Sequence, residues 1–211
     1  MDKILVVASH YDDEVLGCGG TIIKHVSKGD EVNIVFCCVG ESDHLTKEMS
    51  EIRKSQAQMV AEKLKIKQVI ILDIPLIMAE TLPQLEVVRK LLRTLNQIQP
   101  QIVYTHFNDD INSDHRVISN AMSVWLRPSK MPFIKSVYQY EVFASTKNFT
   151  PNHYVDIGLH MEQKLEALGM YTTEINVQTR SIETIRSNGR YRGSEVNLEY
   201  AEAFNVYYQI S

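Results

Sequence analysis

Short apolar runs alternate with longer amphipathic segments along the first two thirds of the chain. The short runs are rich in β-branched and aromatic residues and are bounded by polar or turn residues, which predicts buried strands. The longer segments carry apolar residues near helical spacing, and two of them end just before a proline, which predicts helices. The expected strands are residues 3–9, 31–39, 68–73, 101–106 and 136–143, and the expected helices are residues 14–27, 45–64, 82–98 and 115–126.

This alternation indicates an α/β protein in which helices cover both faces of a parallel sheet. The C-terminal third of the chain is less regular. It predicts two further helices, at residues 159–171 and 175–187, followed by a loop with the sequence "SNGRYRG" at residues 187–193 and a short C-terminal piece.

Chain length and composition limit the number of domains and the kind of molecule that the protein binds. A chain of 211 residues is long enough for one substantial core, so we expect a single domain over residues 1–211. A net charge of −4 argues against a general electrostatic attraction to nucleic acid or to an anionic membrane, so we expect a small-molecule partner. No apolar run looks long enough to span a membrane, and three cysteines without disulfide or zinc-site spacing suit a reducing cytoplasm. The oligomeric state stays open, a homo-oligomer included.

Two loops dense in histidine and aspartate follow expected strands. The first, "SHYDDEVLGCGG", covers residues 9–20 at the end of the first strand, and the second, "THFNDDINSDHR", covers residues 105–116 at the end of the fourth. In an open parallel sheet, ligands bind beyond the carboxyl ends of the strands. We therefore expect the two loops to lie on the same edge of the sheet.

The residue types in these loops suit a divalent metal ion. Taken alone, the first loop could be a solvated turn whose aspartates cap the next helix. The second loop weakens that interpretation, because two histidines and one carboxylate, with a water in the fourth position, make an open catalytic zinc site. His10, Asp13 and His115 would supply the three ligands, and Asp12 would be free to act on the metal-bound water as a general base.

The glycines of "GCGG", residues 17–20, could also suggest a nucleotide-binding turn. In such a turn the glycines follow the strand at once, whereas here three carboxylates intervene and would repel a phosphate. Close packing of the first helix on the sheet explains the glycines better.

The two loops resemble the motifs of a known family. "SHYDDEVLGCGGTI" resembles the A-H-P-D-D-E-x-x-G-x-G-G signature of the LmbE-like, or PIG-L, zinc-dependent sugar deacetylases, and "DINSDHR" resembles their second metal motif, H-P-D-H in several members. Together with "QKLEALGMYTTE" and "EYAEAF", the resemblance extends over almost the whole chain. It implies a Rossmann-like, three-layer α/β fold with a mostly parallel sheet.

The resemblance also implies hydrolysis of the N-acetyl group of an N-acetylglucosamine-type sugar carried on an aglycone. In that reaction His10, Asp13 and His115 resemble the zinc ligands, and Asp12 resembles the catalytic base. Arg53 on the second helix resembles the substrate-facing arginine of the family, although an ion-paired surface role would explain it too.

Three positions depart from the family pattern. The proline of the signature is Tyr11, and an aspartate of the third-strand loop is Leu76, so one sugar-hydroxyl contact is absent or supplied elsewhere. The first histidine of H-P-D-H, which in some members protonates the leaving amine or stabilises the oxyanion, is Asn112. The proton donor would then be Asp12 or His106, and either His106 or Asn112 could help to hold the oxyanion.

Two further acidic residues lie near the expected site. Glu141, at the end of the fifth strand, could line the same pocket or make a structural hydrogen bond. Asp114 beside His115 is expected to fix the loop rather than to bind the ion.

These features predict a hydrolase that uses zinc, or another divalent ion, to remove the N-acetyl group of a small-molecule sugar conjugate. Two alternatives stay open. One is a non-catalytic metal-binding or sugar-binding protein of the same fold, which Asn112 motivates. The other is a metal hydrolase that acts on a non-sugar amide.

Overall fold

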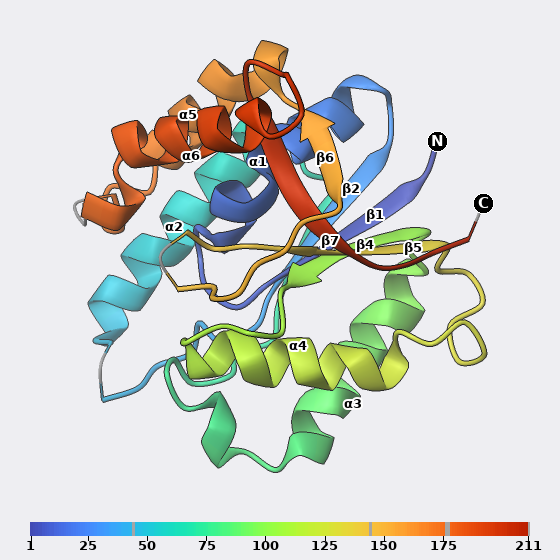
Figure 1. Ribbon diagram of the computed structural model, residues 1–211. Coiled ribbons are helices and arrows are strands. Elements are labelled where there is room, and N and C mark those ends of the chain that lie inside the picture. Colours follow the sequence, from blue (N-terminus) through green and yellow to red (C-terminus); the bar gives the residue numbers. More distant parts are fainter. Residues whose placement is uncertain (44, 144, 176–177, 211) are drawn as a thin grey trace.

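The fold is organised around one seven-stranded sheet in the order β3-β2-β1-β4-β5-β7-β6. The computed structural model of the protein describes residues 1–43, 45–143, 145–175 and 178–210. The five strands from β3 to β5 run parallel to one another, whereas β7 and β6 pair antiparallel at one edge (Figure 1). The strands are β1 (Lys3–Ala8), β2 (Glu31–Phe36), β3 (Gln68–Ile71), β4 (Ile102–His106), β5 (Ser136–Tyr140), β6 (His153–Asp156) and β7 (Ala201–Gln209).

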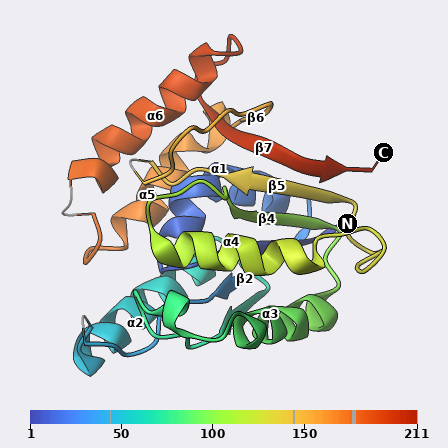
Figure 2. The same ribbon diagram turned by 60° about the horizontal axis from the view of Figure 1, so that its bottom comes forward.

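Helices pack on both faces of the sheet. Figure 1 shows α1, α2, α5 and α6 on one face and α3 and α4 on the other, and Figure 2 shows α4 beside α3 from a second direction. The α-helices are α1 (Asp13–Ser27), α2 (Lys47–Lys63), α3 (Gln84–Ile98), α4 (Ser113–Trp125), α5 (Met161–Gly169) and α6 (Ile182–Ser194). Short 3₁₀ turns are η1 (Ala79–Thr81), η2 (Gly158–His160) and η3 (Gln178–Arg180). None of the helices in the described ranges has the length and apolar character needed to cross a bilayer.

The central strand β1 shows how its sequence produces two cores. Successive side chains of a strand point to opposite faces of the sheet. Ile4 and Val6 accordingly join the core that contains α1, α2, α5 and α6, whereas Leu5 and Val7 join the core that contains α3 and α4. All four are fully buried, which explains a continuous apolar run rather than an alternating one.

The α/β class and the mostly parallel, three-layer arrangement are confirmed. The five expected strands and the first four expected helices form, with ends that shift by a few residues. The antiparallel strands β6 and β7 had not been expected as such; β7 is the short C-terminal piece, and it is nine residues long.

The expectation of a loop at "SNGRYRG" is wrong. These residues lie inside α6, while the helix expected at 175–187 begins at Ile182; residues 176 and 177 lie outside the described part of the chain. The glycines serve packing here rather than a turn. A Cβ on Gly193 would lie 2.6 Å from the carbonyl oxygen of Leu198, so the helix can approach this segment only with glycine.

Helix α1 is broken near its start and held by a buried ion pair. Cys18 has non-helical backbone angles, so amides and carbonyls next to the break lack their helical partners. The carboxylate of Glu202 on β7 accepts hydrogen bonds from the amides of Gly20 and Thr21 at 2.8 and 2.7 Å. Lys164 on α5 donates to the carbonyl of Leu16 at 3.0 Å and to Glu202 at 2.6 Å.

We expect Lys164→Met to lower the free energy of unfolding by about 3–5 kcal/mol, because it leaves a buried carboxylate without its cation. Chemical denaturation measures this difference. Lys63→Met is the matched control, since the Lys63–Glu166 pair is exposed at 41% and 62%. The control is expected to cost no more than about 1 kcal/mol. Equal losses in the two variants would contradict a structural role for the buried pair.

Candidate active site

Three donor atoms from two strand-end loops converge at one point. Asp13 is the first residue of α1, the helix that follows β1, and His115 lies in the first turn of α4, the helix that follows β4. His10 Nδ1 lies 3.4 Å from Asp13 Oδ2 and 3.2 Å from His115 Nε2. His115 Nε2 lies 3.3 Å from Asp13 Oδ2. The structure thus brings together the three residues that the sequence nominates as metal ligands.

Two aspartates fix the outward nitrogens of these histidines. Asp114 Oδ2 lies 3.0 Å from His10 Nε2, and Asp110 Oδ2 lies 3.1 Å from His115 Nδ1. Such outer carboxylates orient metal-binding imidazoles and select their tautomer. Burial alone would lower the pKa of His115, but the Asp13 and Asp110 carboxylates outweigh it and raise this pKa to about 10. The carboxylates of Asp13 and Asp110 thus place negative charge at a buried position, which favours a bound cation.

The donor set fits a divalent ion. Four tetrahedral donors placed about 2.0–2.1 Å from zinc are separated from one another by about 3.3 Å, and the three observed separations run from 3.2 to 3.4 Å. Asp13 Oδ1 is buried and makes no hydrogen bond within the described residues. Two imidazole nitrogens and a carboxylate suit zinc and other divalent transition metals.

Asp12 is held beside this cluster in an unusual backbone conformation. It precedes α1 with φ 104°, and its side chain makes no capping hydrogen bond, which contradicts the interpretation that it only caps the helix. Its amide donates to Glu14 Oε2 at 3.2 Å, and the other oxygen of Glu14 accepts from the Tyr171 hydroxyl. Arg180 Nη1 lies 3.2 Å from Asp12 Oδ2, while Oδ1 has no partner in the described ranges. Burial raises the pKa of Asp12, and the Arg180 guanidinium opposes that shift.

His106 packs against the cluster and does not line the pocket beside His10. It is fully buried and its ring stacks on that of His115, with centroids 4.0 Å apart. Its Nε2 accepts a hydrogen bond from the Ser9 amide at 2.9 Å and lies 3.2 Å from the Tyr140 hydroxyl. Burial lowers the pKa of His106 well below its usual value, which favours a neutral ring.

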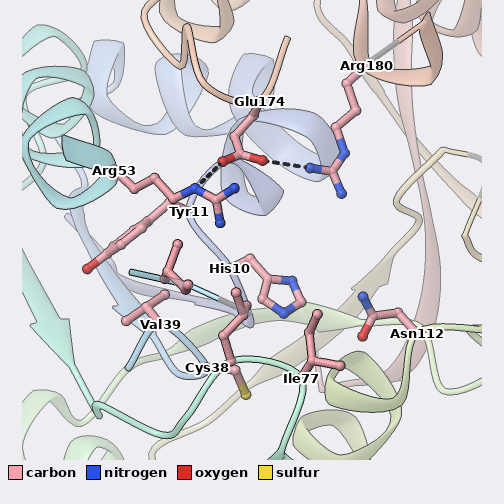
Figure 3. Close-up of a pocket in the computed structure, with 11 residues that line it drawn as sticks. His10, Tyr11, Cys38, Val39, Arg53, Ile77, Asn112, Glu174 and Arg180 are labelled. Carbon is pink, nitrogen blue, oxygen red and sulfur yellow. Dashed lines mark hydrogen bonds and ion pairs between the residues drawn. The ribbon is translucent and has the colours of Figure 1, made fainter. Parts of the chain in front are cut away.

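A pocket of about 250 Å³ opens beside His10. Figure 3 shows Arg53, Glu174 and Arg180 on one side of His10. Glu174 joins the two arginines: its Oε1 lies 2.7 Å from Arg53 Nε and its Oε2 lies 3.0 Å from Arg180 Nη1. Asn112 also lines the pocket. Its side-chain oxygen caps α4 by accepting from the Asp114 amide at 2.9 Å. Its side-chain nitrogen makes no hydrogen bond within the described part of the chain, so it is available to a ligand.

For some residues, most of them outside the two histidine–aspartate loops, the structure differs from the sequence-based prediction or adds to it. Glu141 does not line this pocket; it forms a two-pronged ion pair with Arg192 at 2.7 and 2.8 Å, the structural role that the sequence left open. Arg180 and Glu174 had not been singled out for a role, although Glu174 belongs to the "MYTTE" stretch. Nothing local in the sequence marks Arg180. Asp110 could have been found, because it precedes His115 by five residues in the second loop.

Comparison with known proteins agrees with these features. The profile of the family "GlcNAc-PI de-N-acetylase" (PIG-L) matches residues 5–126, more than half of the chain. A 1D-myo-inositol 2-acetamido-2-deoxy-alpha-D-glucopyranoside deacetylase from Tsukamurella paurometabola is 36% identical over 61 residues. That match covers 29% of this chain and 18% of the curated relative.

Solved structures share the fold over nearly the whole chain. The N,N'-diacetylchitobiose deacetylase of Pyrococcus horikoshii has a TM-score of 0.79 at 23% identity, with 97% of this chain and 83% of that chain covered. The 4-carboxy-2-hydroxymuconate hydratase GalB of Pseudomonas putida has a TM-score of 0.78 at 20% identity, covering 100% and 98% of the two chains. One fold thus carries two reaction classes, and the reaction must be argued from the site.

We expect protein purified without chelators to contain about one equivalent of a divalent ion, as elemental analysis would measure. His115→Ala should abolish its retention, and Asp110→Asn should weaken affinity by about 10–100-fold. His160→Ala, which alters a histidine in η2 outside the donor cluster, is the control and should keep the metal. Less than about a tenth of an equivalent, with no uptake of added zinc, would contradict a metal site.

Proposed function

The chain belongs to the PIG-L family of de-N-acetylases, and we propose that it hydrolyses the N-acetyl group of an N-acetylglucosamine-type sugar conjugate. The observation that carries this proposal is the pairing of a three-donor cluster with the adjacent Asp12, one oxygen of which has no partner in the described ranges. Such a pairing supports hydrolysis of an amide, which needs an electrophile for the carbonyl and a base for the water.

His10, Asp13 and His115 would hold the ion, with zinc as the proposed metal. A bound divalent ion supplies Lewis-acid polarisation of the amide carbonyl and eases deprotonation of water near neutral pH. Asp12 takes the proton from the attacking water as the carbon–oxygen bond forms. The same carboxyl returns the proton to the amide nitrogen as the carbon–nitrogen bond breaks, releasing acetate and a free sugar amine.

The remaining pocket residues would bind the sugar. The guanidinium of Arg53 and the carboxylate of Glu174 offer donors and acceptors to ring hydroxyls, and the Asn112 amide can donate to the substrate carbonyl. The pocket is smaller than the roughly 300–1,000 Å³ of a typical drug-sized site. It therefore suits one sugar unit, with the rest of a conjugate outside.

The non-catalytic alternative rests on Asn112, which lacks the proton of a histidine. Against it stand the retained donor set and a base candidate that makes no capping bond. The two readings differ in one measurement, the release of acetate from N-acetylglucosamine conjugates by the metal-loaded protein.

We expect Asp12→Asn to lower kcat for acetate release by about two to four powers of ten, because an amide cannot accept the water's proton. Metal content should stay near that of the wild type. Asp109→Asn is the control, because it changes an exposed aspartate whose side chain accepts a hydrogen bond from Asn148 at 2.8 Å. Wild-type rates in Asp12→Asn would contradict its role as base.

We expect His106→Gln to change kcat by less than about tenfold at saturating metal, because Nε2 of His106 already accepts a hydrogen bond from the Ser9 amide and the ring stacks on that of His115. A glutamine oxygen can still accept from the Ser9 amide. Acetate release and thermal unfolding would be measured together. A loss of about a hundredfold or more, in a folded and metal-loaded variant, would instead make His106 the proton donor or an oxyanion-stabilising group.

A further inference from the structure

Ile77 combines an unfavourable backbone with an exposed apolar side chain. Its φ is 59°, in the left-handed region that a β-branched residue rarely adopts. Its side chain is 52% exposed, although isoleucine is usually buried. Nothing in local propensity favours isoleucine here, since asparagine or glycine would occupy this backbone at lower cost. Strained residues of this kind cluster at ligand sites, where the surrounding structure holds them in place.

The strained backbone is tied to a proposed metal ligand by one carboxylate. Asp114, which is fully buried, accepts from the Ile77 amide at 2.8 Å and from the Ala79 amide at 3.2 Å. The Asp114 oxygen that binds the Ile77 amide also lies 3.0 Å from His10 Nε2. The position of Ile77 is therefore fixed relative to the donor cluster.

Ile77 forms part of an apolar side of the pocket. Figure 3 shows Ile77 and Cys38 on the side of His10 away from Arg53, Glu174 and Arg180, and Val39 to the left of His10, below Arg53. Val39 and Leu45 are 5% and 6% exposed, so they belong to the buried part of the pocket wall, whereas Ile77 lines the pocket and is 52% exposed. A ligand that covers Ile77 would remove a large part of its apolar surface from water.

The reacting acetamide must lie at the donor cluster, and the sugar hydroxyls pair best with the charged side of the pocket. The part of the substrate that reaches the exposed Ile77 is then the aglycone. We propose that Ile77 is a specificity-determining residue that contacts an apolar aglycone, so that the preferred substrates are N-acetylglucosamine conjugates with an apolar group next to the sugar. This inference rests on the proposed function and adds the substrate class.

The test compares two conjugates of similar size, n-butyl and glyceryl N-acetylglucosaminide, by acetate release from the metal-loaded protein. We expect the wild type to favour the butyl conjugate by about tenfold in kcat/KM, in line with the value of small apolar contacts. Ile77→Asn should bring this ratio close to one, mainly by lowering the rate with the butyl conjugate. Thermal unfolding of the variant should occur at the wild-type temperature or above it, because asparagine tolerates this backbone.

Two control variants distinguish a direct contact between Ile77 and the aglycone from a general effect of the substitution on the protein. Ile77→Val keeps an apolar, β-branched side chain and should keep the preference for butyl. Leu85→Asn changes a leucine in the first turn of α3 that is 56% exposed and does not line the pocket, and should leave both rates unchanged. If Ile77→Asn does not fold, Ile77→Gly gives the same comparison with a residue free of the backbone strain.

The outcomes distinguish the inference from the proposed function. A wild-type ratio near one, or equal losses for both conjugates in Ile77→Asn, would overturn the role of Ile77 while leaving deacetylation intact. A preference for butyl that survives Ile77→Asn would overturn it as well. Acetate release from neither conjugate by the metal-loaded wild type would overturn the proposed function, and the inference with it.

Discussion

The Asp13 carboxylate is the constraint on which the rest of the site depends. Its Oδ2 lies 3.4 Å from His10 Nδ1, 3.3 Å from His115 Nε2 and 3.5 Å from His106 Nε2, and the side chain is almost fully buried. Burial raises the pKa of a carboxyl, yet the surrounding histidines outweigh it and hold the pKa of Asp13 well below its usual value. An unpaired charge at this depth would be costly. The ends of β1 and β4 must therefore stay in register for the site to exist.

Placing Asp13 at the first position of α1 creates a second requirement. The helix must begin at the cluster and still lie against the sheet, and it does so by breaking at Cys18. A Cβ on Gly17 would lie 2.2 Å from the Tyr140 ring, so glycine is needed where the helix meets β5. The Lys164–Glu202 pair then supplies the hydrogen bonds lost at the break. The glycine-rich stretch is thus explained by close packing, as the sequence had indicated, rather than by a phosphate.

The sequence predicts those features whose physical cause is local or follows from topology. Fully buried runs predict the central strands, and the edge rule for parallel sheets predicts that His10 and His115 meet. The sequence does not predict the contact between Arg180 and Asp12, because Arg180 lies far along the chain and reaches Asp12 by tertiary packing alone. The same reason applies to the ion pair of Glu141. Its partner Arg192 lies on α6, a segment whose glycines had indicated a loop rather than a helix. The catalytic roles of Asp12 and His106 stay predictions.

Asn112 shows how one position can serve the fold and limit the chemistry at once. Its oxygen caps α4, and this keeps His115 in the first turn of the helix and therefore at the cluster. Its nitrogen can donate a hydrogen bond to a polarised carbonyl but cannot transfer a proton to a leaving amine. Because Nε2 of His106 already accepts a hydrogen bond from the Ser9 amide, both proton transfers of the proposed reaction would pass through the free oxygen of Asp12. A single carboxyl that takes and then returns one proton needs no second acid, so the loss of the histidine is compatible with turnover.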